Sequence, residues 1–238
     1  MHLSEPAAPP IPSATVVPLR DRPGGGLEVL MVERAEALAY GGMWAFPGGR
    51  VDPTDADPAR PGDELAAARR TAVREASEEV GLAFPPEALV PFSHWTGGAA
   101  QARRYAAWYF VAPAPAGTVV PDGRETLDHR WLSPTEALAA RDRGDLDVVA
   151  PTWVTLHALA EARSVADVLD LAAGREPVVY LSRMAVTDAA RIALWHGDAG
   201  YASGDPLVPG SRHRLTMTDA GWTFERSQTG PRTGPRSG

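Results

Sequence analysis

Short runs of apolar and β-branched residues, bounded by turn residues, predict several β-strands in the first half of the chain. Thr15 to Leu19 and Leu27 to Arg34 are two such runs, and the glycines at 24–26 supply a turn between them. The same pattern predicts three more strands, at Phe92 to Thr96, Tyr105 to Ala112 and Arg130 to Leu132. We therefore expect this part of the chain to build a sheet.

A helix is predicted between Asp63 and Gly81, because apolar residues recur there at helical spacing. Asp63 is a favourable N-cap, and Gly81 is a favourable residue just past a helix end. The predicted apolar face consists of Leu65, Ala66, Ala72, Val73, Ala76 and Val80. Arg69 falls inside this face, and nothing in the sequence accounts for it.

Three further helices are expected at 134–143, 152–162 and 165–173. The first follows a capping box, Ser133 to Glu136, with Pro134 at the first helical position. Strands mixed with helices of this size predict an α/β (α+β) fold, specifically an α/β/α sandwich around a mixed sheet.

The chain divides by composition into four expected segments. Residues 1–12 form a flexible N-terminus, 13–173 the main domain, 174–226 a β-rich C-terminal extension and 227–238 a disordered tail. The extension contains a predicted strand, Pro177 to Leu181, and a hairpin, Leu215 to Arg226. It is expected to pack on the core, to complete the substrate pocket or to form the seam of a homodimer, and the sequence does not choose among these.

The most informative run is Arg74 to Leu82, which places Arg74, Glu75, Glu78 and Glu79 within roughly 140° of one helical surface. Like charges one turn apart destabilise a helix, and a single arginine cannot neutralise three carboxylates. A hard divalent cation such as Mg²⁺, which prefers oxygen ligands, would complete the balance. A solvated acidic face is the alternative interpretation.

Two segments precede this helix. Phe46-Pro47-Gly48-Gly49 breaks an apolar stretch, and its paired glycines allow backbone to approach a ligand closely. The polar loop from Asp52 to Asp63 follows, and it is expected to lack regular structure. Strand, glycine loop and helix with exposed carboxylates together favour the metal-site interpretation.

Gly49, Arg74, Glu75, Glu78, Glu79, Gly81 and Leu82 together resemble the Nudix box of the MutT-type diphosphate hydrolases. The second half of the box matches closely. The first half departs from it, because the loop after Gly49 carries eleven extra residues and Ala66 occupies the position of the first glutamate. In the family that glutamate supports the rest of the box. The acids nearest to Ala66 are Asp63 and Glu64, and the sequence does not show which residue takes over this function.

The resemblance implies an enzyme that hydrolyses a nucleoside diphosphate linked to another group, with water as nucleophile. It implies Mg²⁺ or Mn²⁺ held by the Gly49 carbonyl and by Glu75, Glu78 and Glu79. Glu78 and Glu79 then belong to the catalytic set, and Arg74 orients the glutamates. It also implies the α/β/α fold over about residues 13 to 170.

Two further groups are candidates for the site. Glu125 precedes the predicted strand at Arg130, where related enzymes place a general base or an extra metal ligand; a solvated loop acid is the alternative. Arg103, Arg104 and Tyr105 could clamp phosphate and stack on a base, or could be an exposed strand end.

The substrate is predicted less directly. The long insertion after Gly49 and the Trp131 to Pro134 segment are similar to the peroxisomal coenzyme A diphosphatase branch, which implies cleavage of CoA or acyl-CoA. ADP-ribose or a nucleotide sugar is the alternative substrate. A nucleotide-binding sensor without turnover is a third possibility, although such a site has no need for three metal-ready carboxylates.

Composition excludes several classes of protein. The net charge of −7 argues against general nucleic-acid affinity, and the absence of cysteine excludes disulfides and thiolate metal sites. No run reaches the length of a membrane span, and the N-terminus lacks the pattern of a signal peptide. We therefore expect a cytoplasmic enzyme that acts on a small diphosphate.

Overall fold

The computed structural model describes residues 8–56, 60–98 and 103–227. Its contacts divide the chain into two units, Met1–Tyr180 and Leu181–Gly238. The predicted N-terminal segment and tail fall largely outside the described residues, and β1 already begins at Ile11.

The first unit is built around an eight-stranded sheet. Its strands are β1 (Ile11–Asp21), β2 (Leu27–Arg34), β3 (Trp44–Ala45), β4 (Gly48–Arg50), β5 (Val90–Thr96), β6 (Tyr105–Pro113), β7 (Thr126–Leu132) and β8 (Val178–Leu181). The order is β3-β2-β1-β6-β5-β8, with β4 also paired to β1 and β7 also paired to β2. β1 runs parallel to β6 and antiparallel to β2 and β4, so the sheet is mixed.

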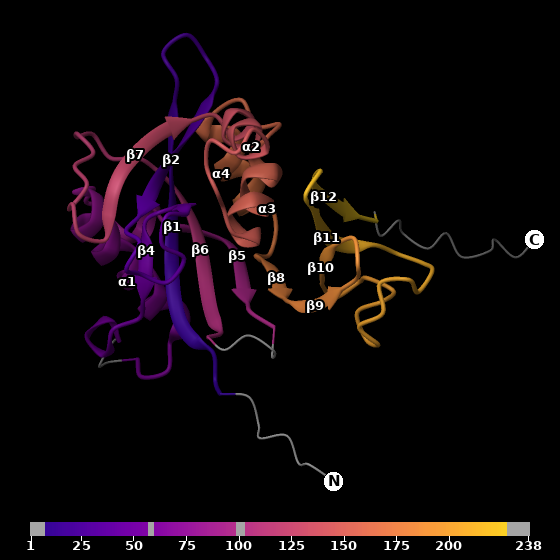
Figure 1. Ribbon diagram of the computed structural model, residues 1–238. Helices are drawn as coiled ribbons and strands as arrows, with labels where there is room; N and C mark the ends of the chain where they lie inside the picture. The colour runs from indigo at the N-terminus through magenta and orange to yellow at the C-terminus, as the bar shows by residue number, and fades with distance from the viewer. Residues whose placement is uncertain (1–7, 57–59, 99–102, 228–238) are drawn as a thin grey trace, which may run out of the picture. The chain divides into compact units, whose positions relative to one another are not determined.

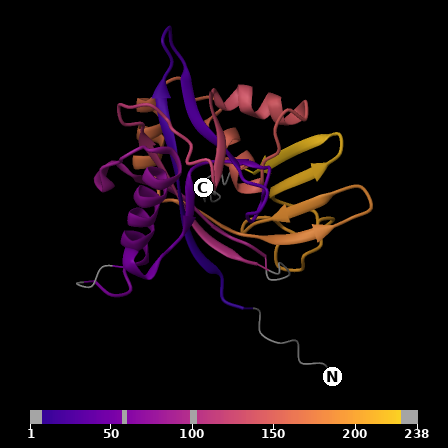
Figure 2. The ribbon, with the colours of Figure 1, turned by 60° about the vertical axis from the view of Figure 1, so that its left-hand side comes forward.

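Helices cover both faces of this sheet, as the sequence predicts. They are α1 (Glu64–Val80), α2 (Pro134–Asp142), α3 (Ala150–Leu159) and α4 (Val165–Ala173). Figure 1 shows α1 on one side of the sheet and the other three helices on the opposite side, and Figure 2 shows the arrangement turned by 60°. The predicted α/β/α sandwich is confirmed.

The face of α1 toward the sheet is made largely of alanine. Ala68, Ala72 and Ala76 are buried against strand residues that include Val16 and Phe110. Small side chains let a helix axis come close to the strands, so α1 lies near the backbone of β4. Asp63 caps the helix and Gly81 ends it in the left-handed conformation, both as predicted.

Arg69 now has an explanation. Its Nε donates a hydrogen bond to the Leu89 carbonyl at 3.3 Å, and its guanidinium lies 5.7 Å from the centre of the Phe110 ring. The aliphatic part of the Arg69 side chain therefore packs against the core, while its guanidinium donates a hydrogen bond to a backbone carbonyl.

Two local predictions need correction, and one short turn was not predicted. The loop after Asp52 contains a 3-10 turn, η1 (Pro53–Asp55), whose ends close a capping box between Asp52 and Asp55. β7 begins at Thr126 rather than at Arg130, because its pairing with β2 continues through a register shift at Glu33. A second short turn, η2 (Pro86–Ala88), follows α1.

The second unit contains a four-stranded antiparallel sheet in the order β12-β11-β10-β9. The strands are β9 (Arg183–Val186), β10 (Arg191–Leu194), β11 (His213–Thr218) and β12 (Gly221–Arg226). The hairpin of β11 and β12 matches the predicted one, whereas β9 and β10 have no counterpart in the sequence prediction. The predicted strand at Pro177 to Leu181 is β8, which neighbours β5 in the sheet of the first unit.

A buried ion pair holds the long connection between β10 and β11. Arg214 donates from Nε and Nη2 to the two carboxylate oxygens of Asp198, at 2.7 and 2.6 Å. The backbone N–H groups of Gly200 and His213 also donate to Asp198. Burial alone would raise the pKa of Asp198, but these donors lower it to about 2.

We expect this pair to make the stability of the second unit depend on acid. Because the folded-state pKa of Asp198 is depressed, its contribution of about 2 kcal/mol is present above pH 4 and lost as the pH falls toward 2. Urea unfolding of the wild-type protein and Asp198→Asn should therefore differ at pH 6 and converge near pH 2. A difference that stays constant over this range would contradict the assignment.

Candidate active site

The backbone of β4, which carries both glycines, donates a hydrogen bond to one side chain in the C-terminal half of α1 and accepts a hydrogen bond from another. β4 pairs with β1, which brings Gly48 beneath the helix, and the Gly48 N–H donates to Glu79 Oε2 at 2.9 Å. A Cβ on Gly49 would lie 2.3 Å from Glu75 Oε1, so a larger residue cannot occupy this position without displacing that carboxylate. Gly49 is required by the closeness of β4 to α1, whereas a Cβ on Gly48 would collide with Ala14 and Thr15 of β1.

Glu79 is almost completely buried, with 2% of the residue exposed. Burial raises its pKa to about 8, and the Gly48 N–H and Arg34 only partly oppose this effect. Its Oε1 accepts no hydrogen bond within the described part of the chain, and Arg34 Nη1 lies 3.7 Å away. A buried carboxylate oxygen without a donor is an open position for a cation.

Glu75 and Glu78 lie beside it, and both are held by Arg74. Arg74 Nη1 donates to Glu75 Oε1 at 2.9 Å and to Glu78 Oε2 at 3.0 Å. Glu75 is largely buried, and burial raises the pKa of its carboxyl group. The Glu78 side chain is 61% exposed, so it can turn away from Arg74 at small cost.

The donor set fits a hard divalent cation. In the described ranges no three acidic or histidine side chains already converge on one point, because Glu75 and Glu78 face Arg74. The available groups are nevertheless all oxygen donors, as Mg²⁺ and Mn²⁺ prefer, and the unpaired Glu79 oxygen lies among them.

Asp55 is a site residue that the sequence prediction did not include. It comes from η1, and both of its oxygens receive hydrogen bonds from Arg74, from Nε at 3.1 Å and from Nη2 at 2.9 Å. Thr71 Oγ1 donates to the same carboxylate at 2.8 Å. Although burial opposes ionisation, these donors keep the pKa of Asp55 below its ordinary value. The pairing crosses 19 residues. Counted forward from Gly49, however, Asp55 stands at the spacing that the box pattern gives its first acid, so that count would have found it.

Glu125 lies in the loop before β7. The carboxylate of Asp122 accepts from the backbone N–H groups of residues 124, 125 and 126, which shapes this loop. The Glu125 carbonyl accepts from Ala35 N at 2.9 Å. The charge of Glu125 contributes to the raised pKa values of Glu75 and Glu79, which places its carboxylate in the neighbourhood of the box.

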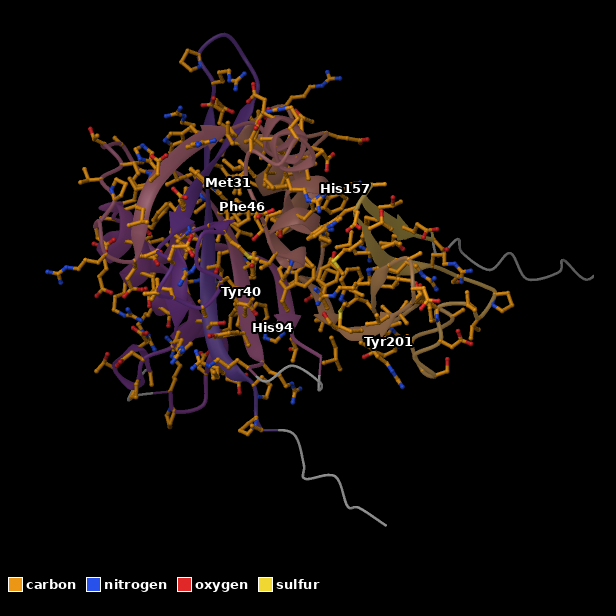
Figure 3. The ribbon with its side chains drawn as sticks, in the orientation of Figure 1. Met31, Tyr40, Phe46, His94, His157 and Tyr201 are labelled. Carbon is orange, nitrogen blue, oxygen red and sulfur yellow. The ribbon has the colours of Figure 1, made fainter. Side chains whose placement is uncertain are left out.

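The three residues at the start of β6 have different surroundings. Arg103 is exposed, whereas Arg104 donates to the carbonyls of Gly97 and Ala8. The Tyr105 ring lies 6.2 Å from the ring of Tyr40, with an angle of 51° between them. Tyr40, labelled in Figure 3, is half exposed and has a positive φ of 61°.

Arg34 connects this aromatic pair to the glycine segment. Its Nε donates to the Ala39 carbonyl, and its Nη1 lies 3.5 Å from the Gly48 carbonyl. The turn that carries Tyr40 and the backbone beside Glu79 therefore share one guanidinium. The structure brings Glu75, Glu78, Glu79, Arg74 and Gly49 together as predicted, and it adds Asp55, Arg34 and Tyr40.

The chain matches known proteins in sequence and in fold. The family model described as NUDIX domain matches residues 9–153, which is more than half of the chain. An uncharacterised Nudix hydrolase, NudL, from Cronobacter sakazakii is 47% identical over 78 residues, covering 32% of this chain and 33% of that protein. The match thus spans about a third of the curated relative.

A solved structure shows the same fold. The crystal structure of a NUDIX hydrolase from Alicyclobacillus acidocaldarius superimposes with a TM-score of 0.61 at 22% identity. The match covers 72% of this chain and 98% of that one. None of the described helices is both long and apolar enough to cross a membrane.

We expect Gly49→Ala to damage the site through the new Cβ. The methyl group would overlap Glu75 Oε1, so the carboxylate or β4 must move, at a cost of about 1–3 kcal/mol. Thermal unfolding should show the loss. Arg50→Ala, which shortens the exposed neighbouring side chain on the same strand, should change the melting temperature little. Equal stability of Gly49→Ala and wild type would mean that the end of the Glu75 side chain moves aside at little cost.

Proposed function

The chain belongs to the Nudix family, and from this premise we propose that it is a divalent-metal-dependent hydrolase. It would cleave the phosphoanhydride of a nucleoside diphosphate that is linked to another group. The observation that carries the proposal is the buried Glu79 carboxylate, whose Oε1 is open beside Gly49 and Glu75. An acidic surface helix would keep its carboxylates in water instead.

Each residue of the box has a proposed task. The Gly49 carbonyl, Glu75, Glu78 and Glu79 would hold Mg²⁺ or Mn²⁺, and Arg74 would orient Glu75 and Glu78. A bound ion would neutralise the diphosphate, lower the pKa of a water molecule and stabilise the leaving oxygen. Nudix hydrolases in general need divalent cations; the identity of the ion here is part of the proposal.

Glu125 is our candidate for general base or additional ligand. Its carboxylate lies close enough to Glu75 and Glu79 to influence both, and its loop is ordered by Asp122. An exposed acid on this loop is well placed to approach the diphosphate once a cation has reduced the local negative charge.

The start of β6 is proposed to contact the rest of the substrate. Arg103 and Arg104 would contribute positive charge for phosphate, and Tyr105 would stack on a planar ring. The neighbouring Tyr40 supports this assignment, because two half-accessible aromatic rings beside an arginine favour a flat, charged ligand. Arg104 would have to exchange a backbone hydrogen bond for this contact.

CoA or acyl-CoA is our first choice of substrate, on the length of the insertion after Gly49 and on the Trp131 to Pro134 segment. ADP-ribose or a nucleotide sugar is the second choice, since either carries the same diphosphate. A nucleotide sensor without turnover is less well supported, because pure binding does not require the open carboxylate of Glu79. A cytoplasmic location and a homodimer stay predictions.

We expect Glu78→Gln and Glu79→Gln to lower kcat by two or more orders of magnitude, because each removes a charged ligand. Hydrolysis with Mg²⁺ and with Mn²⁺ should be measured, and circular dichroism should confirm that the fold is kept. Glu87→Gln, an exposed glutamate on η2, is the matched control and should retain full activity. Wild-type turnover in both box variants would refute the metal assignment.

A substrate panel should separate the three alternatives. We expect release of phosphopantetheine and adenosine 3′,5′-bisphosphate from CoA, and the acylated equivalents from acyl-CoA, in the presence of Mg²⁺ or Mn²⁺. Hydrolysis restricted to ADP-ribose would reject the CoA assignment. Nucleotide binding by calorimetry without hydrolysis of any compound would favour the sensor.

A further inference from the structure

Tyr40 has a backbone conformation that tyrosine rarely adopts. Its φ of 61° lies in the left-handed region, and among the residues that the structure describes it is the only one other than glycine to do so. A bulky side chain disfavours this conformation, whereas glycine takes it up freely. Strained residues of this kind cluster at functional sites, which makes the Tyr40 side chain a candidate for contact with a ligand.

The turn around Tyr40 is fixed by hydrogen bonds that do not involve its ring. The Arg34 carbonyl accepts from Gly42 N at 2.9 Å, and Arg34 Nε donates to the Ala39 carbonyl at 3.3 Å. The Tyr40 carbonyl accepts from Met43 N at 3.2 Å. The backbone would therefore accept a glycine at position 40, and the tyrosine ring is not what holds the turn together.

Packing within the protein accounts for only part of the Tyr40 side chain. The residue is 47% exposed, and its ring centre lies 6.2 Å from that of Tyr105 at an angle of 51°. Tilted rings at this distance touch through an edge, so neither covers the face of the other. The two rings form a corner in which Tyr105, the less exposed residue, supports Tyr40 from the side.

Arg34 joins this corner to the box. Its Nε reaches the turn at Ala39, while its Nη1 lies 3.7 Å from Glu79 Oε1. A single guanidinium thus separates the turn from the carboxylate that would hold a cation. In a nucleoside diphosphate only a ribose stands between the diphosphate and the base. A diphosphate held at Glu79 therefore leaves its base within reach of Tyr40.

A nucleobase is the part of the proposed substrates that suits an accessible aromatic ring. Stacking of a base on an aromatic side chain requires a free ring face and no particular pattern of hydrogen bonds. The other end of these substrates, a pantetheine chain or a sugar, has no flat π face to set against the ring. The corner is thus matched to the base end of the substrate.

We propose that Tyr40 is a specificity-determining residue that stacks on the nucleobase of the substrate, with Tyr105 as its lateral support. The assignment rests on the proposed diphosphate hydrolase function. It places the base end of the substrate at the turn between β2 and β3. The left-handed conformation is then the means by which the turn presents the ring to the ligand.

The test compares the binding of adenosine 5′-monophosphate (AMP) with that of ribose 5-phosphate, which lacks the base, by calorimetry in the presence of Mg²⁺. Wild-type protein should bind AMP about 5- to 150-fold more tightly, the range that stacking on one aromatic ring produces. Tyr40→Leu keeps an apolar side chain but has no flat face, so it should lose most of this preference. Tyr40→Phe is the matched control and should retain it.

Two results of this comparison would overturn the proposal. One is an undiminished preference for AMP in Tyr40→Leu, which would show that the base stacks elsewhere. The other is wild-type protein that binds AMP no more tightly than ribose 5-phosphate, or that binds neither compound.

Tyr40→Gly separates ligand binding from folding. We expect its melting temperature to stay within about 4 °C of wild type, because the relief of backbone strain offsets the lost contact with Tyr105. The preference for AMP should disappear in the same variant. A large fall in melting temperature together with an intact preference for AMP would assign the ring to packing alone and contradict the proposal.

Hydrolysis distinguishes failure of this assignment from failure of the proposed function. In Tyr40→Leu the KM for CoA or ADP-ribose should rise while kcat changes little, because stacking on the base is the same in the ground state and the transition state. A lowered kcat at unchanged KM would argue against base stacking. Wild-type protein that hydrolyses a diphosphate without preferring AMP would refute only the assignment of Tyr40. Selective AMP binding without hydrolysis of any compound would refute the proposed function instead.

Discussion

The close approach of α1 to β4 is the constraint on which the site depends. The approach is possible because α1 turns alanines toward the sheet and β4 is made of Gly48, Gly49 and Arg50. Its result is the hydrogen bond from Gly48 N to the buried carboxylate of Glu79. A bulkier residue on either side would separate helix and strand, and Glu79 would then be solvated like any surface acid.

Burying several carboxylates in one region is electrostatically unfavourable. The arginine contacts that offset this repulsion are distributed unevenly among the carboxylates. Arg74 neutralises Asp55 and contacts Glu75 and Glu78, and these partners raise the pKa of its guanidinium. Glu79 has only a distant arginine, at 3.7 Å. Among the box carboxylates, Glu79 is therefore the least compensated, and the proposed function needs a cation there. In the second unit, by contrast, the buried Asp198 is paired with Arg214.

Elements whose signals are local were predicted well. The caps of α1, the capping box before α2 and the hairpin of β11 and β12 depend on residues within a few positions of one another. Predictions failed where pairing partners are distant or the local pattern is weak. β7 extends to Thr126 because β2 offers it hydrogen bonds, and β9 and β10 are four-residue strands, too short to show a period.

The sequence by itself determined the family, through the box residues Arg74, Glu75, Glu78 and Glu79, and the helical spacing of these residues indicated a cation site with oxygen ligands. It also determined the main layers of the fold through apolar periodicity. Only the tertiary structure decided that Asp55 holds Arg74, why Arg69 belongs in an apolar face and which box carboxylate is left open. Each of these depends on contacts across 14 to 41 residues, such as Arg34 with Gly48 and Arg69 with Phe110. Such contacts form only when burial brings separate elements together, and no spacing along the chain encodes them.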